Sequence, residues 1–379
     1  MRLLWGPHIF VLSLRYERIS RSIPVAAPGA GHQRMSKKRA SSRLTHLSQY
    51  LALRGVASFM QCFPVDQNLH TAGAIGSLYA RLGAKRRRRA EHNLRLSFPE
   101  WPEERVRAVA EESLQHMFRL FMVDALVVHR IITPASWPRY IRLGSIGPIL
   151  DRLIRGEPMI LVTGHCGNWE LLGHFFALLG YPAVALARPL DNPFINDWLL
   201  NIREARGTTV VTKWGATPIL QETIERGGRV GFIADQNAGD QGLFVPFFGR
   251  LASSYKSIGL LAMRYDVPIV AGHARRINGR LTYQIDCIDA IEPSDWADQP
   301  DPLFYITARF NRAMETMIRA APEQYLWLHR RWKSRPKHER KGEPIPEKLV
   351  EKLRALPWMT EPELERIIEH SNHPPPAPE

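Results

Sequence analysis

Hydrophobic positions along the chain follow two different periodicities. From residue 44 to about residue 130, apolar residues recur every three or four positions, which predicts amphipathic helices. From about residue 157, short apolar runs typical of strands alternate with helical stretches. The runs that we expect to form strands are 158–163, 182–187, 208–212, 229–234 and 267–274, with a last strand at 281–287. This alternation predicts an α/β fold in which helices flank a mostly parallel central sheet.

The helical stretches define the extent of the predicted domain. Between the strands they cover residues 169–180, 192–207, 217–228 and 253–266, and a long helix is expected at 302–320. We expect one domain over residues 44–335, with a helical part at 44–130 and an α/β part at 157–335. A carboxyl-terminal helix and a disordered tail, HPPPAPE, are expected within residues 336–379.

Charge is unevenly distributed along the 379 residues, whose formal net charge is +14. Residues 1–43 hold nine Lys and Arg residues and a single acid, Glu17, so this segment alone carries +8. Its apolar start is broken by Pro7 and Arg15, unlike the continuous core of a secretory signal. We expect a basic extension that is disordered or precedes a true start at Met35, and composition leaves a transit peptide open.

The three cysteines, Cys62, Cys166 and Cys287, lie far apart in the sequence and have no metal-ligand spacing. Such a sparse, odd set argues against a disulfide framework and is typical of a reducing compartment. No metal-ligand cluster is visible in the sequence, and we expect neither a metal nor a cofactor.

Two segments favour contact with a membrane. No run reaches the roughly 18 to 20 apolar residues that a transmembrane helix needs. The nearest candidates are 50–63, which contains Arg54, and 113–128, which polar residues interrupt. As amphipathic helices of a basic chain, they favour peripheral or monotopic attachment to an anionic membrane surface. That both are ordinary core helices is an equal alternative.

The basic run from Lys85 to Arg89 has three interpretations, which are nucleic-acid contact, contact with anionic lipid head groups, and a solvated helix face. No signature of a nucleic-acid module accompanies the run, so we expect no nucleic-acid partner. The other two interpretations stay open on the sequence.

The stretch TGHCGNWELLG, residues 163–173, carries the strongest chemical signal. Helical spacing resumes at Trp169 with Asn168 as the predicted N-cap, so His165 lies in the loop after a buried strand. Active groups of α/β proteins lie at this end of the strands. There His165 can fold back toward Glu170, whose carboxylate would orient the imidazole and raise its basicity. The pair is predicted to be a general base and its orienting group, although a purely structural pair is the alternative.

Further candidates follow other strands. Cys166 is a weak candidate nucleophile, because adjacent residues at a strand end point apart. Arg188 follows the strand at 182–187, and Asp235 and Gln236 begin the stretch DQNAGDQGLFVPFFGR. Since the carboxyl ends of parallel strands share one edge of a sheet, we expect His165, Arg188 and Asp235 to converge on one crevice.

The block APEQYLWLHRRWKSRP, residues 321–336, combines aromatic and basic residues. We take Glu323 and Arg330 from it as candidates for substrate binding, with a solvated helix end as the alternative.

These motifs together resemble the late acyltransferases of lipid A biosynthesis, the lauroyl/myristoyl acyltransferase family. His165 and Glu170 match its His-x4-Asp/Glu motif, and Arg188 with Pro189 matches its Arg-Pro pair. Asp235 and the sequence FVPFFG match its Asp-rich turn and the strand after it. PEQYLWLHRRWKSRP is similar to its carboxyl-terminal signature, and the resemblance spans roughly residues 45–335.

The resemblance implies an O-acyltransferase in which His165, oriented by Glu170, deprotonates a hydroxyl of a glycolipid acceptor. That oxygen would attack an acyl thioester without a covalent acyl-enzyme. The implied partners are acyl-carrier protein (or acyl-CoA) as the donor, a lipid A precursor as the acceptor, and an anionic membrane surface. The implied location is the cytoplasmic face of the inner membrane, and Arg188, Asp235, Gln236, Glu323 and Arg330 are the expected substrate-binding residues.

Four alternatives remain on the sequence, and the last of them is a basic nucleic-acid-binding protein. One is an acyl-CoA-dependent enzyme that acts on a phosphatidylinositol mannoside, because GHCGNWE is similar to the wording of such relatives. Another is a glycerolipid acyltransferase, which the carboxyl-terminal block disfavours. The third is a lipid- or carrier-binding protein without turnover, against which the retention of both His165 and Glu170 counts.

Overall fold

The computed structural model describes residues 43–205, 207–212 and 215–374. The expected basic extension, apart from Arg43, lies outside the described residues, as do residues 375–379 of the expected tail.

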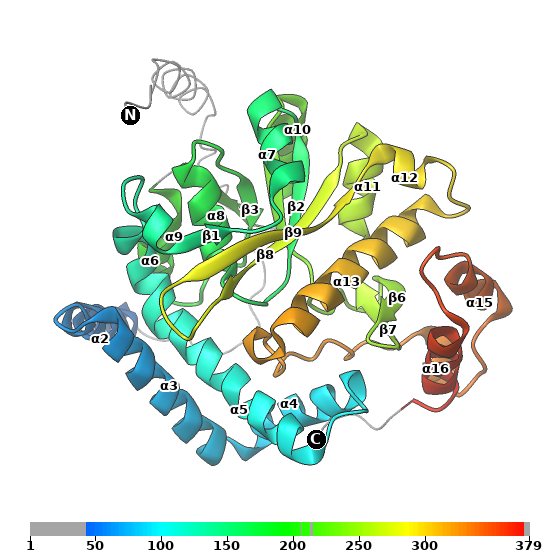
Figure 1. Cartoon of the computed structure of the whole chain (residues 1–379), viewed down its shortest axis with the longest axis horizontal. Helices are drawn as coiled ribbons and strands as arrows, with labels where there is room; N and C mark the ends of the chain where they lie inside the picture. Colours follow the sequence, from blue (N-terminus) through cyan, green and yellow to red (C-terminus); the bar gives the residue numbers. More distant parts are fainter. Residues whose placement is uncertain (1–42, 206, 213–214, 375–379) are drawn as a thin grey trace, which may run out of the picture.

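A seven-stranded sheet forms the centre of the molecule, with the strand order β1-β9-β8-β2-β5-β3-β4 (Figure 1). The strands are β1 (Ile141–Leu143), β2 (Met159–Thr163), β3 (Val184–Leu186), β4 (Thr209–Val211), β5 (Arg229–Ile233), β8 (Ile269–Arg276) and β9 (Tyr283–Ile291). All neighbouring strands are parallel except β8 and β9, which are antiparallel. The predicted α/β fold with a mostly parallel sheet is confirmed.

The structure differs from the sequence-based expectation at short or irregular strands. Only the first of the three residues of β1 is buried, so its sequence has no apolar run to indicate a strand. The FVPFFG stretch does not join the large sheet, since β6 (Leu243–Phe247) pairs only with β7 (Arg250–Ser254) in an antiparallel hairpin. Because Ser253 and Ser254 belong to β7, the helix expected at 253–266 begins at Lys256.

Alternate residues of the central strands are buried in two hydrophobic clusters, one on each face of the sheet. On β2, Met159 belongs to one cluster, whereas Ile160 and Val162 belong to the other. On β8, Val270 belongs to the cluster of Met159, and Ile269 belongs to the cluster of Ile160, as expected because successive side chains point to opposite faces of a strand. Helices α6 (Ala125–Ile131), α7 (Gly147–Arg155), α8 (Trp169–Leu178), α9 (Pro193–Glu204), α10 (Ala216–Glu225), α11 (Lys256–Tyr265), α12 (Pro293–Ala297) and α13 (Pro302–Ala320) surround the sheet.

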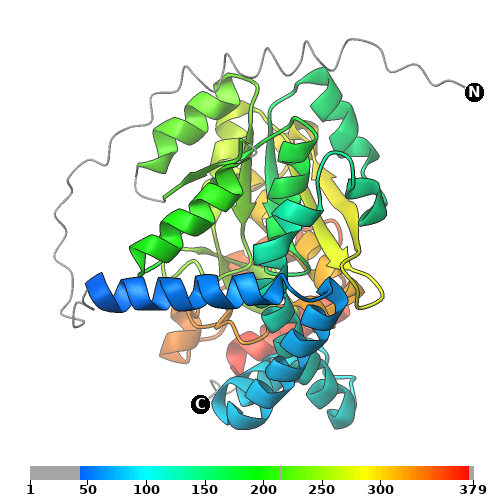
Figure 2. The same cartoon turned by 90° about the vertical axis from the view of Figure 1, so that its left-hand side faces the viewer.

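The amino-terminal part is helical, as predicted. Helices α2 (Arg43–Met60), α3 (Val65–Leu82), α4 (Ala84–Ser97) and α5 (Glu103–Arg119) are followed by the π-helical turn η1 (Leu120–Asp124). Figure 2 shows α2 along the outside of the α/β part, with α3 turning away from it. A Cβ at Gly76 of α3 would lie 2.6 Å from the Cα of Gln115, so glycine permits the close approach of α3 to α5. Within residues 43–374, the described helices include none with the length and hydropathy needed to cross a membrane.

The carboxyl-terminal segment contains three helices where the sequence indicated one. They are α14 (Lys337–Lys341), α15 (Glu347–Arg354) and α16 (Glu361–Asn372). Leu353, Leu364 and Ile367 are fully buried in the same cluster as Ile160 and Val162 of the sheet. Helices α15 and α16 therefore pack onto the core of the α/β part.

Candidate active site

The loop that carries His165 joins β2 to α8. Asn168 caps α8 as predicted, because its side chain accepts a hydrogen bond from the amide of Leu171 at 2.9 Å. Gly167 has a φ of 63°, and a Cβ there would lie 2.2 Å from the carbonyl oxygen of Ala274. A larger residue at Gly167 would push the loop away from β8.

Buried polar side chains of the helical part hold the same loop. Asp124, in the π-helical turn, accepts a hydrogen bond from Asn168 at 3.0 Å and forms an ion pair with Arg276 of β8. Burial and the charge of Arg276 lower the pKa of His116 to about 3, so this imidazole is neutral at pH 7. Its Nε2 lies 3.1 Å from the carbonyl oxygen of Gly167 and can donate to it. The loop is thus anchored by η1, α5 and β8 together.

The carboxylate bonded to His165 is that of Asp235. Strands β2 and β5 are parallel neighbours, so the residues that follow them lie side by side at one edge of the sheet. The Oδ1 atom of Asp235 lies 2.7 Å from the Nδ1 atom of His165, and Asp235 has no exposed surface. When Nδ1 donates its proton to Asp235, Nε2 of the neutral imidazole is the atom that can accept a proton.

Charges around this pair favour an ionised aspartate and a basic histidine. Burial lowers the pKa of His165. This effect is outweighed by the charge of Asp235, by the hydrogen bond between Asp235 and His165, and by the charge of Glu170, so the pKa is raised overall. Burial raises the pKa of Asp235, but the charge and hydrogen bond of His165 and the charge of His329 bring it down to about 2. Asp235 is therefore an anion at neutral pH, and His165 is a stronger base than an ordinary histidine.

Glu170 is held by a different partner from the one the sequence predicted. Arg203 of α9 donates two hydrogen bonds to its carboxylate, with distances of 2.9 and 2.5 Å. The structure therefore places Asp235, and not Glu170, on Nδ1 of His165. Glu170 acts on His165 through its charge alone. A spacing of five residues could not reveal the Asp235 contact, since that contact depends on the pairing of β2 with β5.

Three other side chains lie close to the imidazole of His165. The amide nitrogen of Gln236 lies 3.4 Å from Nε2. The ring centroids of Trp169 and His329 lie 4.7 and 5.0 Å from that of His165. Burial and the charge of His165 lower the pKa of His329 to about 4, so His329 is neutral at pH 7. The sequence singled out the block around His329 without assigning this residue to the site.

Arg188, Glu323 and Arg330 are not brought onto His165. The Arg188 side chain is 81% exposed and forms an ion pair with Asp191 at 3.7 Å. The Glu323 carboxylate accepts a hydrogen bond from the neighbouring Gln324, and Arg330 is exposed. In the described residues, neither a hydrogen bond nor an ion pair joins any of the three to His165. The expected convergence thus holds for Asp235 but does not extend to Arg188.

The backbone of the block at 321–336 runs against the His165 loop. The amide of Leu326 donates to the carbonyl of His165 at 3.1 Å, and the amide of Gly167 donates to the carbonyl of Gln324 at 3.0 Å. The hydroxyl of Tyr325 is buried beside Asp235, and burial followed by the charge of Asp235 raises the Tyr325 pKa well above its ordinary value. This pairing explains why so distant a block belongs to the site.

Arg331, next to Arg330, is a buried structural side chain. It donates to the carbonyl of Ser253, to the hydroxyl of Ser254 at 2.6 Å and to the side chain of Asn311 at 2.9 Å. It also reaches the carbonyl of Gln236 at 3.4 Å, so it supports the turn that carries Gln236.

Cys166 has the properties of a filler and not of a nucleophile. Its thiol is buried and contacts the sulfur of Met317 at 3.9 Å. Burial and the charge of Asp235 raise its pKa to about 12, so the thiolate that a nucleophile requires does not form at neutral pH.

An apolar cavity of about 390 Å³ lies against the sheet next to this site. Strands β2, β3, β5 and β8 line it on one side, and residues of α6, α8 and α9 line it on the other. His165 lies outside the lining, but Trp169, Glu170 and Arg203 belong to it, so the cavity begins beside the His165 loop. A Cβ at Gly173, on α8, would meet no atom within 4 Å, which leaves this part of the cavity open. The cavity suits an alkyl chain, and His165 suits proton transfer at one end of it.

No group of three His, Cys, Asp or Glu side chains that could hold a metal ion is formed by the part of the chain that the structure describes.

Known proteins are similar to this chain over most of its length. A family model described as bacterial lipid A biosynthesis acyltransferase matches residues 36–334. The chain is 26% identical over 269 residues to the lipid A biosynthesis lauroyltransferase of Escherichia coli K12. The matched region covers 69% of this chain and 84% of that protein. It is 26% identical over 263 residues to a lipid A biosynthesis acyltransferase of Haemophilus influenzae, with 68% and 78% covered. It is also 26% identical over 275 residues to the lipid A biosynthesis myristoyltransferase of Escherichia coli K12, with 69% and 79% covered.

Proposed function

The chain belongs to the family of bacterial lipid A biosynthesis acyltransferases, and on this premise we propose that it uses His165 and Asp235 to acylate a hydroxyl of a lipid A precursor. It is an enzyme that transfers acyl groups. The observation that carries the proposed mechanism is the 2.7 Å contact between Asp235 and Nδ1 of His165, which makes Nε2 the unprotonated ring nitrogen that can act as a base.

In the proposed reaction, Nε2 of His165 takes the proton of the acceptor hydroxyl while its oxygen attacks the carbonyl carbon of an acyl thioester. The tetrahedral intermediate expels the thiolate, and the imidazolium of His165 returns the proton to the sulfur. Asp235 holds the ring in the required tautomer and stabilises the imidazolium. The new ester forms without an acyl-enzyme, so the buried Cys166 has no part in the reaction.

Glu170, which the sequence predicted to orient His165, acts on it only indirectly in the proposed mechanism. Its charge raises the pKa of His165, and its ion pair with Arg203 forms part of the wall between the base and the cavity. We propose that Glu170 and Arg203 position the thioester end of the donor.

The apolar cavity is the proposed site of the donor acyl chain. Gly173 offers a direct test, because a leucine there would extend into open space and fill part of the cavity. Leucine also favours a helix more than glycine does, so a change in activity would not reflect loss of α8. We expect Gly173→Leu to shift the donor preference toward shorter acyl chains, measured with a series of donors. An unchanged preference, with intact folding, would remove the cavity from the proposal.

Exposed apolar side chains of α2 and α3 support attachment to a membrane surface. They are Leu44, Leu47, Leu51, Phe59, Leu78 and Leu82. One side of α2 is held by α9, since Asn192 donates to the carbonyl of His46 at 2.9 Å and Arg54 lies over the ring of Trp198 at 5.1 Å. We propose peripheral or monotopic attachment at the cytoplasmic face of the inner membrane through the remaining surface of α2 and α3.

The test is transfer of a labelled acyl group to a Kdo-bearing lipid A precursor in detergent. Acyl-carrier protein, the expected donor, is compared with acyl-CoA, and wild type is compared with His165→Ala and Asp235→Ala. Transfer by wild type with near-complete loss in both variants is the expected result. Activity that survives loss of His165 would overturn the mechanism. Acylation of a phosphatidylinositol mannoside or a glycerolipid instead, with the same dependence on His165, would keep the reaction and replace the acceptor.

A further inference from the structure

Helix α4 has an unusual distribution of charge at its amino-terminal end. Residues 85–89 are one lysine and four arginines, and the first turn contains no acid. Cations at the amino-terminal end of a helix face the positive end of its dipole, which is unfavourable. The following helix, α5, has the ordinary arrangement, with Glu103 and Glu104 in its first turn. The carboxyl-terminal end of α3 offsets part of this repulsion, since Arg87 donates to the carbonyl of Ala80 at 3.2 Å, and a bound anion would relieve the remainder.

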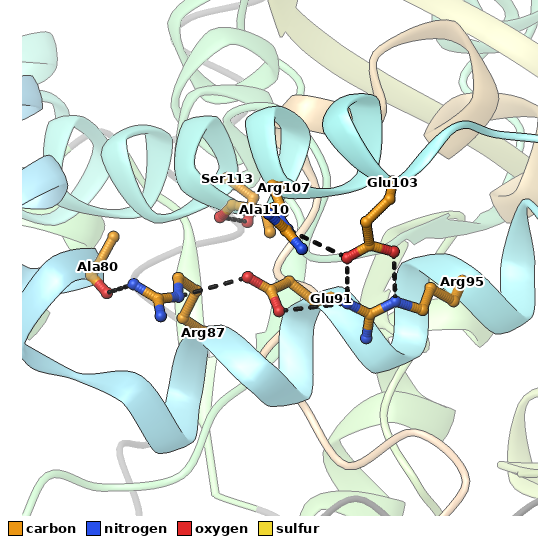
Figure 3. Close-up of polar contacts among 8 residues, drawn as sticks. All are labelled: Ala80, Arg87, Glu91, Arg95, Glu103, Arg107, Ala110 and Ser113. Atoms are coloured by element: carbon orange, nitrogen blue, oxygen red, sulfur yellow. Dashed lines mark hydrogen bonds and ion pairs between the residues drawn. The ribbon is translucent and has the colours of Figure 1, made fainter.

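One side of α4 is neutralised within the protein. Figure 3 shows a chain of ion pairs in which Arg87 contacts Glu91, Arg95 contacts Glu91 and Glu103, and Arg107 contacts Glu103. The bond between Arg95 and Glu103 measures 2.5 Å. These arginines have partners and are not available to a ligand.

The other side of α4 faces the active-site block. Asn93 donates to the carbonyls of Trp327 and His329, at 2.7 and 3.1 Å. Arg89 lies one turn before Asn93 on the same face of the helix, and Arg86 lies almost one turn further. This geometry brings Arg86 and Arg89 toward Arg330, the residue after His329.

Arg86, Arg89 and Arg330 have no carboxylate partner among the residues that the structure describes. The two charges that act on Arg89 are those of Arg330 and Arg86, and both are positive. The Nε atom of Arg89 is buried and has no hydrogen-bond partner within the described chain. The guanidinium of Arg86 also lies over the ring of Tyr79, 5.3 Å from its centroid. Guanidinium groups match the geometry of a phosphate, whose oxygens accept several charged hydrogen bonds at once.

We propose that Arg86, Arg89 and Arg330 form a binding subsite for a phosphate group beside the catalytic histidine. His329 connects the two places, because its ring lies 5.0 Å from that of His165 and Arg330 follows it in the chain. The phosphate belongs to a substrate, either as a phosphomonoester of the acceptor lipid or as the phosphodiester of the donor's thiol-bearing arm. The role of the subsite in acyl transfer rests on the proposed function, whereas its affinity for phosphate does not.

The first experiment measures binding without turnover. Methyl phosphate and dimethyl phosphate are titrated against the full chain in detergent at fixed ionic strength, with binding followed by phosphorus NMR. The proteins are wild type, His165→Ala, the double variant Arg89→Gln/Arg330→Gln, and Arg330→Lys. The control is Arg88→Gln, which removes one charge from another face of the same helix.

We expect wild type, His165→Ala and Arg88→Gln to bind methyl phosphate alike. The double variant should bind at least about ten-fold more weakly, because each hydrogen bond between charged groups contributes that much or more. Arg330→Lys, which keeps the charge but loses the planar fork, should show a smaller loss. No binding by wild type, or equal binding by the double variant and Arg88→Gln, would overturn the subsite.

The second experiment identifies the source of the phosphate. KM is measured for the donor and for acceptors with and without a phosphomonoester. A rise of about ten-fold in the double variant, confined to the phosphorylated acceptor, supports a lipid phosphate, and a rise confined to the donor supports its phosphodiester. No change in either KM overturns a role in the reaction. If methyl phosphate binds but wild type transfers no acyl group, the proposed function fails and the subsite stands.

Discussion

Two carboxylates lie close to His165, and they differ in burial and in hydrogen-bond partner. Asp235 is fully buried and contacts Nδ1 at 2.7 Å. The side chain of Glu170 is 24% exposed and is bound by Arg203 from a different helix. The first comes from a neighbouring strand 70 residues away, and the second from the first turn of the next helix, five residues away.

In this site, nearness in sequence does not indicate which carboxylate contacts His165. A carboxylate fixed at the end of a parallel strand has a defined place relative to its neighbour, because the sheet hydrogen bonds set the register. Glu170 is on a helix, where a nearby arginine captures it. A buried anion with few partners also acts more strongly on His165 than an exposed one already paired with a cation.

Of the substitutions at the two carboxylates, replacing Asp235 by asparagine should have the largest effect on kcat. Asparagine keeps the size but removes the charge that stabilises the imidazolium and selects the tautomer. We expect kcat to fall by about 10³- to 10⁴-fold, because the imidazole would lose its required tautomer and the charge that stabilises the imidazolium. A loss of ten-fold or less, with folding intact, would contradict the orienting role of Asp235. Steady-state kinetics and calorimetry on the same preparation separate these cases.

Removing the ion pair of Glu170 should have a smaller effect. Glu170→Gln and Arg203→Gln are each expected to reduce kcat/KM by roughly ten-fold, because the pair is half-exposed and its charges are screened. The matched control is Glu222→Gln, which breaks an exposed ion pair with Arg226 on α10. If Glu170→Gln loses as much activity as Asp235→Asn, Glu170 would return to the orienting role that the sequence suggested.

The pH dependence of kcat/KM should show the smallest difference between the contributions of the two carboxylates. A general base must be neutral, so kcat/KM should rise with pH through the pKa of His165, with a midpoint above its ordinary value of 6.5. Glu170→Gln should move this midpoint down slightly, since one raising charge is lost. Asp235→Asn should move it further down, because burial then acts with little opposition. Equal midpoints in wild type and Asp235→Asn would show that Asp235 does not control the basicity of His165.

Periodicity alone determined much of the fold. Buried parallel strands are continuous apolar runs, so those at 158–163 and 229–234 were visible without the structure. The long helix was visible for a similar reason, since its amphipathic spacing runs unbroken from Pro302 to Ala320. Strand β1 could not be predicted because neighbouring elements, and not its own residues, make it a strand.

Within the site, the sequence determined the place of His165 and the cap at Asn168, since both follow from a strand that ends and a helix that begins. Local pattern could not determine the partner of His165, because that depends on which strands are neighbours. Because β2 pairs with β5, Asp235 contacts the imidazole of His165. Because α9 lies beside α8, Arg203 binds Glu170. Contacts between residues far apart in the chain are decided by tertiary structure, because hydrophobic periodicity shows which face of an element is buried but not which other element packs against it.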